Sequence, residues 1–267
     1  MDWPLINICL LTLVIHLIGA LAYAARIAGV RTRKIALSFA LFNILVLVSR
    51  TSNSFLGPFL AKRIENGLAT GTGDRLLWDL RLVLLSATIA TVLGALAVPT
   101  VQRWFAGAIE QFHQHRSVPK LFLTALSPKN WGRVTKAIKL PSAGHVKLLS
   151  KPSAVSWNVI FMNVMAQALL TVGVIASLYA GYLYPEFRVT ASQLSAVVNG
   201  LATILLFVLI DPQLSVMTDD VIEGRVSEPD YRRTVVWLSM SRIAGTLLAQ
   251  ILLLPSAWLI VWVAVRV

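Results

Sequence analysis

The chain has 267 residues, of which 57% are hydrophobic and only 13% are charged, and its formal net charge is +12. Its mean hydropathy is +0.73. Soluble domains carry about 25% charged residues, so this composition excludes an ordinary soluble protein and predicts a polytopic membrane protein. The single cysteine, Cys9, excludes an internal disulfide.

Long uncharged stretches predict about six membrane-spanning helices, because roughly 20 apolar residues cross the hydrocarbon core of a bilayer. We therefore predict an all-α fold, a polytopic membrane helical bundle that forms one membrane domain over residues 1–267. The first helix lacks a preceding basic segment, so we expect it to be retained and not cleaved as a signal peptide. The predicted helices cover residues 5–25, 35–57, 82–101, 155–184, 192–210 and 234–262.

Glycine and proline positions predict where some of these helices end. Gly57 and Pro58 indicate the end of the second helix, and Asp211 followed by Pro212 indicates the end of the fifth. The fourth apolar run is longer than one straight helix needs, which leaves open a break near Gly173.

The basic residues predict how the helices are oriented. Of the 24 Lys and Arg residues, 16 follow the first, third and fifth helices, whereas six lie in the other connections or at the end of the chain. The positive-inside rule then places both termini outside the cytoplasm. Three helices in each half also permit a 3+3 inverted repeat, a design that many transporters use.

A basic segment, residues 103–152, holds nine Lys and Arg residues against the single acid Glu110. Its apolar residues come in clusters between the basic ones, as in segments that lie on an anionic leaflet. The same mixture suits nucleic acid, but the membrane surface is the nearer partner. We therefore expect this loop to bind anionic membrane lipids and expect no nucleic-acid partner.

Arg50 is the first candidate functional residue, because it lies deep inside an apolar run. Fifteen uncharged residues separate it from Lys34, which places it ~24 Å along the helix, within a core roughly 30 Å thick. An arginine at this depth normally faces the protein interior or a wet cavity. Ser49 and Asn53 beside it predict a polar lining that does not face lipid.

Arg242 is a second candidate, since it is the one charge of the sixth predicted helix. Two arginines at different depths suit a diphosphate headgroup that passes between leaflets, because a guanidinium group binds phosphate oxygens with a planar fork. His16 in the first helix and Asn43 in the second would extend this path. Alternatively, Arg242 lies at the membrane interface and His16 is an ordinary hydrogen-bonded histidine of the bundle.

Asp211 ends the fifth predicted helix on the side where Arg242 enters the sixth. The two residues could pair across the helices. An ordinary helix cap explains Asp211 equally well, and the sequence leaves both readings open.

The acidic residues Asp219, Asp220 and Glu223 are those that a metal-dependent enzyme acting on prenyl phosphates would use. No second spaced pair of aspartates accompanies them, and the sequence contains no catalytic triad or nucleotide-binding loop. We therefore expect no metal, no cofactor and no enzymatic activity. A secondary transporter for a small anionic substrate and a membrane enzyme acting on prenyl phosphates remain the alternatives from the residues alone.

Three segments carry a resemblance to a known family. They are ALAYAARIAGVRTRK at residues 20–34, LVSRTSNS at 47–54 and IDPQLS at 210–215. In these segments, and in its length and helix count, the chain resembles the Amj family of bacterial lipid II flippases, the alternate to MurJ. The resemblance implies a protein of the bacterial cytoplasmic membrane that moves lipid II, or a related polyprenyl-diphosphate lipid, to the outer leaflet. Whether the chain forms a homo-oligomer stays open.

Overall fold

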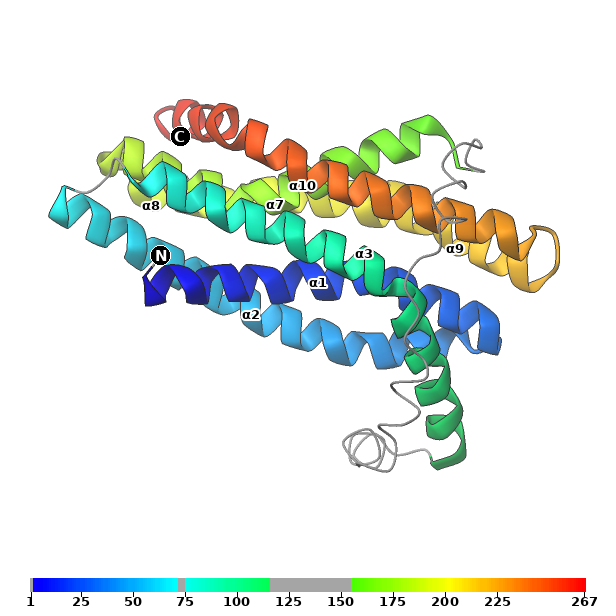
Figure 1. Cartoon of the computed structure of the whole chain (residues 1–267). Helices are drawn as coiled ribbons and strands as arrows, with labels where there is room; N and C mark the ends of the chain where they lie inside the picture. Colours follow the sequence, from blue (N-terminus) through cyan, green and yellow to red (C-terminus); the bar gives the residue numbers. More distant parts are fainter. Residues whose placement is uncertain (1, 72–74, 116–154) are drawn as a thin grey trace.

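The computed structural model describes residues 2–71, 75–115 and 155–267, and all regular structure in these ranges is helical (Figure 1). Six helical segments are long and apolar enough to cross a membrane, which confirms the predicted all-α bundle. The segments are α1 (Trp3–Thr32), α2 (Ile35–Thr70), α3 (Leu76–His115), α7 (Trp157–Leu183), the continuous path of α8 (Arg188–Ile204), the π-helical η4 (Leu205–Ile210) and α9 (Asp211–Ile222), and α10 (Glu228–Ala264). The short 3₁₀ turn η3 (Pro185–Phe187) joins α7 to α8.

The predicted end of the second helix at Gly57 and Pro58 is wrong. Helix α2 continues through Pro58 to Thr70, over 36 residues, a length of ~54 Å. Membrane helices tolerate an internal proline, because neighbouring helices and local adjustments satisfy the backbone groups that it frees. Helix α2 is therefore longer than the hydrocarbon core, and its last turns extend beyond it.

The predicted end of the fifth helix at Asp211 is also wrong. The helical path continues through the π-helical turn η4 and then forms α9, in which Pro212 lies in the first turn. Membrane helices tolerate such a proline, because local π-helical adjustments can satisfy the backbone groups that it frees. Helix α7 runs without interruption through Gly173, so the fourth segment is unbroken.

Helix α3 also continues beyond its predicted end, to His115. The first residues of the predicted basic loop therefore belong to a helix, and Phe105 is buried against Phe42 of α2 with ring centroids 6.3 Å apart. Figure 1 shows this last part of α3 turning away from the bundle. The rest of the predicted lipid-binding loop, residues 116–152, lies outside the described residues.

The two halves of the chain share one packing plan. In the first half α1 packs against both α2 and α3, and in the second half α7 packs against both α8 and α10. The segments alternate in direction, so the two chain termini lie at the same end of the bundle (Figure 1), called the termini end below. Three spans per half are what an inverted repeat requires, and that repeat stays a prediction.

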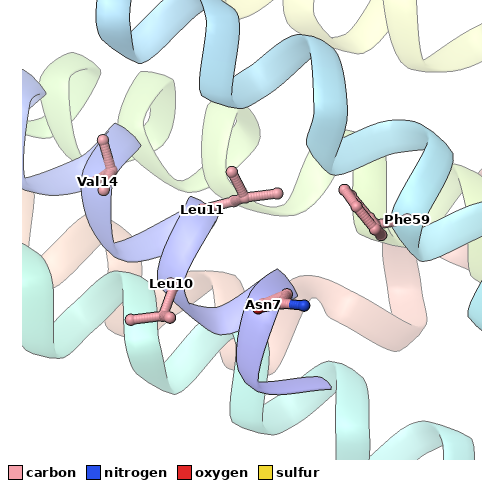
Figure 2. A pocket seen from close by; sticks show the side chains of 5 residues that line it. All are labelled: Asn7, Leu10, Leu11, Val14 and Phe59. Carbon is pink, nitrogen blue, oxygen red and sulfur yellow. The ribbon is translucent and has the colours of Figure 1, made fainter. Parts of the chain in front are cut away.

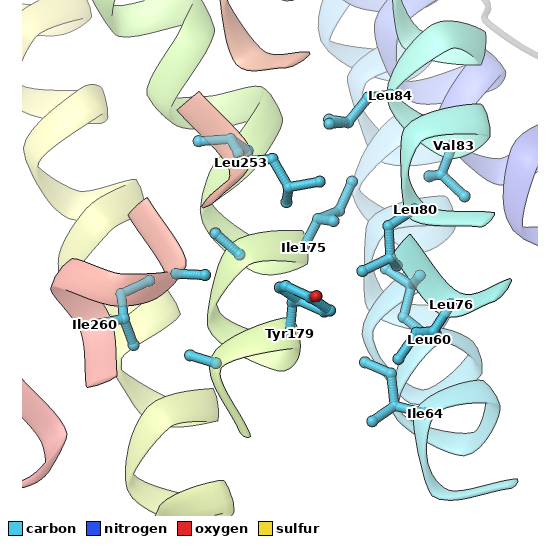
Figure 3. Close-up of a cluster of buried hydrophobic side chains, with 14 of the residues drawn as sticks. Leu60, Ile64, Leu76, Leu80, Val83, Leu84, Ile175, Tyr179, Leu253 and Ile260 are labelled. Atoms are coloured by element: carbon cyan, nitrogen blue, oxygen red, sulfur yellow. The ribbon is translucent and has the colours of Figure 1, made fainter. Parts of the chain in front are cut away.

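The two ends of the bundle have different cores. At the termini end, one apolar cluster combines residues of α1, α2, α3, α7, α8 and α10, among them Leu60, Leu80 and Leu253 (Figure 3). At the opposite end, a second cluster draws its fully buried residues from α1, α2, α3, α9 and α10, and α7 contributes none of them. A third, smaller cluster combines Val159 and Ala166 of α7 with Ile210 of η4, so the two halves contribute buried residues at both ends of the bundle.

A charged cluster also joins three helices at the termini end. The Arg63 guanidinium group of α2 donates to Asp79 of α3 over 2.6 and 2.9 Å, and to both carboxylate oxygens of Asp2 over 2.9 Å. Asp2 caps the N-terminus of α1. The hydrogen bond from Arg63 holds the pKa of Asp2 below its usual range.

In each half, a glycine of the third helix allows close contact with the first. A Cβ atom at Gly94 of α3 would lie 2.5 Å from Cβ of Ala20 in α1, and one at Gly245 of α10 would lie 2.6 Å from the carbonyl oxygen of Val164 in α7. Small residues at such crossings let the backbones approach. In both halves, a glycine of the third helix therefore permits its close approach to the first helix.

Gly245→Ala is expected to destabilise the bundle, because the new methyl carbon would collide with the backbone of α7. We expect a loss of about 1–3 kcal/mol, measured as a lower midpoint of thermal unfolding of the purified protein in detergent. Gly200→Ala on α8 is the matched control, since no heavy atom lies within 4 Å of its added carbon. Equal midpoints for the two variants would contradict the proposed contact.

Candidate functional site

One face of α1 carries a row of polar residues through the bundle. His16, Gly19, Tyr23 and Arg26 are spaced by three or four residues, so they lie on the same side of the helix. His16, Tyr23 and Arg26 are each 8–9% exposed. We call these four residues, together with the groups that contact them on α7, α9 and α10, the polar ladder.

Arg26 forms the end of the ladder that lies away from the chain termini. Its Nη2 atom donates to Oδ1 of Asp211 over 2.8 Å, and its guanidinium group lies 4.9 Å from the ring centre of Phe39. The Asp211 side chain is 39% exposed. This ion pair joins α1 of the first half to the start of α9 in the second, directly after the π-helical turn.

The predicted pair of Asp211 with Arg242 is therefore replaced by a pair of Asp211 with Arg26. The prediction assumed that the fifth helix ends at Asp211 and that Arg242 lies near the same end of the sixth helix, which was predicted to begin at residue 234. Both helices continue past these points, so the two residues do not share a helix end. The direction of each side chain then decides its partner, and Asp211 faces α1.

Arg242 lies further inside, against the same face of α1. A Cβ atom at Gly19 would lie 2.2 Å from its Nη2 atom, so the guanidinium group occupies the space that the glycine leaves. It also interacts electrostatically with His16 and with the Tyr23 hydroxyl group. Within the described parts of the chain, Nε of Arg242 and Nδ1 of His16 have no hydrogen-bond partner. Hydrogen-bonding capacity therefore remains in the middle of the bundle.

Asn163 of α7 completes the ladder, and the sequence analysis missed it. Its Nδ2 atom donates to Oγ of Ser241 over 2.7 Å and to the Leu238 carbonyl oxygen over 3.4 Å. The Tyr23 hydroxyl group donates to the same carbonyl oxygen over 3.4 Å. Asn163 is 1% exposed, and an uncharged amide in a long apolar run gave no signal comparable to that of an arginine.

The predicted residues on α2 do not reach this ladder. Arg50, Asn53 and Asn43 are exposed on α2, and Ser49 is partly buried. Among the residues that the structure describes, the Arg50 side chain takes part in no ion pair. The structure thus brings together His16, Arg242 and Asp211, and it places the α2 residues on a separate surface whose role stays a prediction.

Two hollows border the helices. A groove of about 420 Å³ lies between α3 and α10, lined by α3 residues from Val92 to Gln102, by α10 residues from Arg232 to Ile243, and by Ile27. A smaller hollow of about 250 Å³ lies between α1 and α2 near the termini end. Its lining residues are Asn7, Leu10, Leu11, Val14 and Phe59 (Figure 2).

Two of the three acidic residues that a metal-dependent enzyme would use, Asp220 and Glu223, are engaged in ion pairs. Arg225 binds Asp220 at 2.6 Å and also binds Glu223. In the described ranges, no group of three or more His, Cys, Asp or Glu side chains is arranged to hold a metal ion.

The fold and this interior define a multi-pass helical membrane protein with arginines inside its bundle. Residues 11–264 match the family Amj, "Alternate to MurJ", and the chain belongs to this family. It is 36% identical over 255 residues to the lipid II flippase Amj of Bacillus subtilis (strain 168), a match that covers 94% of this chain and 93% of the relative. No solved structure matches. The chain is therefore a multi-pass protein of the bacterial membrane.

Arg26→Ala is expected to destabilise the protein, because it leaves the Asp211 carboxylate without its partner. Breaking a fully buried pair costs about 3–5 kcal/mol; since Asp211 is 39% exposed, we expect about 1–3 kcal/mol, read as a lower midpoint of thermal unfolding in detergent. The reversed pair, Arg26→Asp with Asp211→Arg, should recover part of the loss. Arg31→Ala, an exposed arginine of the same helix, is the control, and an equal loss there would argue against the ion pair.

Proposed function

We propose that this protein is a lipid II flippase, which moves the undecaprenyl-diphosphate-linked peptidoglycan precursor from the cytoplasmic to the outer leaflet. The observation that carries the proposal is the similarity to a lipid II flippase over 94% of the chain. Six spanning segments without a metal-binding cluster among the described residues suit transport better than catalysis. The substrate is amphipathic, so its path must offer cations for the diphosphate and apolar surface for the chain.

The polar ladder supplies the first requirement. We propose that Arg242 and His16 contact the diphosphate, because both retain unpartnered nitrogen atoms in the middle of the bundle. A guanidinium group binds two phosphate oxygens at once, which the ammonium group of a lysine does not do in the same way. Arg26 and Asp211 would hold α1 and α9 in place beside this point. Arg50, with Ser49, Asn53 and Asn43, would serve the substrate separately, along the exposed surface of α2.

We further propose that the chain termini lie outside the cytoplasm, as the distribution of Lys and Arg residues predicts. The ladder then extends from the middle of the membrane toward the cytoplasmic side. The anionic lipids of that leaflet would contact the basic segment after α3.

The orientation can be tested with cysteines in a Cys9→Ser background. Asn66 lies near the end of α2 at the termini end, Glu223 lies in the turn between α9 and α10, and both are exposed. In intact cells, an impermeant thiol reagent should label Asn66→Cys and should label Glu223→Cys only after the membrane is opened. The reverse pattern would invert the proposed topology.

The function can be tested by growth of cells that have been depleted of their lipid II flippases. The wild-type protein should restore growth. Arg242→Ala and Arg50→Ala should accumulate to wild-type levels on immunoblots yet fail to restore it, and Arg242→Lys and Arg50→Lys should retain part of the activity, because they keep the charge but lose the planar fork.

Arg266→Ala is the control for this experiment, since Arg266 stacks on Trp262 at the end of the chain, away from the ladder. It should restore growth fully. Normal growth with Arg50→Ala would remove Arg50 from the substrate path, and failure of the wild-type protein itself would contradict the proposed function.

A further inference from the structure

The groove between α3 and α10 is a second feature of the interior that the polar ladder does not use. It is walled by the two halves of the protein, α3 from the first and α10 from the second. Its volume of about 420 Å³ lies within the range of small-molecule sites, roughly 300–1,000 Å³. Along α10 it extends from Arg232 to Ile243, a length of ~17 Å.

The groove opens sideways toward the lipid. Leu96 of α3 and Met240 of α10 both line it, and both are more than 40% exposed at the outer surface of the bundle. Of its eleven other lining residues, eight are apolar: four valines, two isoleucines, one alanine and one proline. A groove that is apolar and opens at membrane depth is accessible to hydrocarbon chains and not to water-soluble molecules.

The end of the groove that lies away from the chain termini is polar. Arg232 and Gln102 line it from α10 and α3, and Arg232 also donates to Glu228 over 2.6 Å. In the part of the chain that the structure describes, Nε of Arg232 and Oε1 of Gln102 are buried without hydrogen-bond partners. The Arg232 cation and its free Nε–H donor are complementary to a phosphate group, whereas Oε1 of Gln102 accepts hydrogen bonds and suits a donor group of the ligand.

The same stripe of α10 connects the groove to the polar ladder. Arg232, Val235, Ser239 and Arg242 are spaced by three, four and three residues, so they follow one side of the helix. Arg232, Val235 and Ser239 line the groove, and Arg242 lies beyond it against Gly19. An arginine thus lies at each end of this stripe of α10.

We propose that the α3–α10 groove binds the isoprenoid chain of a polyprenyl-diphosphate lipid, with the diphosphate at Arg232 before it passes to Arg242. The inference rests on the proposed flippase function and adds to it the site where the lipid enters from the membrane. If the isoprenoid chain is held between the two halves, the diphosphate headgroup remains free to move along α10 from Arg232 to Arg242.

Native mass spectrometry of the purified full-length protein can test the groove, with undecaprenyl diphosphate and undecaprenol as probes. Ala95→Phe and Ser239→Phe each place a ring inside the groove, and we expect each to lower the occupancy of both probes about tenfold, equivalent to about 1.4 kcal/mol. Arg232→Gln should weaken undecaprenyl diphosphate but not undecaprenol, because only the former carries phosphate. Ala244→Phe, an exposed position on α10 outside the groove, is the matched control and should bind both probes normally.

Three results would overturn the proposal. The first is normal binding by Ala95→Phe and Ser239→Phe, provided that both elute as folded protein in size-exclusion chromatography. The second is equal loss of binding in Ala244→Phe. The third is displacement of undecaprenyl diphosphate by equimolar phosphatidylglycerol, which would make the groove a general phospholipid site. None of these affects growth restored by the wild-type protein, so they leave the proposed function standing.

Discussion

A charged group in the low-dielectric interior of a membrane protein must find partners within the protein, and this constraint shapes the contact between the two halves. Arg26 satisfies this constraint through its ion pair with Asp211 and its contact with the ring of Phe39. Arg242 satisfies this constraint in part, through the Tyr23 hydroxyl group, with its guanidinium group in the space that Gly19 leaves. The face of α1 that carries these groups therefore has to lie against α9 and α10, since turning it toward lipid would leave the charges unpaired.

The two halves are joined at both ends of the bundle, by different contacts. An apolar core drawn from both halves and the Arg63 cluster close the termini end. At the opposite end a second apolar core combines α1, α2 and α3 with α9 and α10, and the Arg26–Asp211 pair joins α1 to α9 beside the α3–α10 groove. The glycine contacts at Gly94 and Gly245 keep each half compact within itself.

The π-helical turn η4 lies in the fifth spanning segment, next to the contact between the two halves of the protein. It comes directly before Asp211, the partner of Arg26, and π-helical turns within α-helices are frequent at functional sites. Two of the segments that carry the family resemblance, residues 20–34 and 210–215, therefore meet in space through one ion pair. Their separation along the chain gives no indication of this contact.

The sequence by itself determined the class of fold, the number of spans and the family, because these follow from apolar length, composition and recognisable segments. It also identified Arg242, His16 and Asp211 as candidates, since polar groups in apolar runs are conspicuous. It placed helix ends wrongly at Pro58 and Asp211, because the rules for proline come from helices in water. Only the tertiary structure decided that Arg26 is an interior residue, that Asp211 is its partner, that Asn163 bonds to α10 beside Tyr23 and that Arg50 lies on a separate surface. The physical reason is that a linear pattern shows how deep a residue lies in the membrane, whereas the rotation and packing of six helices decide which side chains face one another.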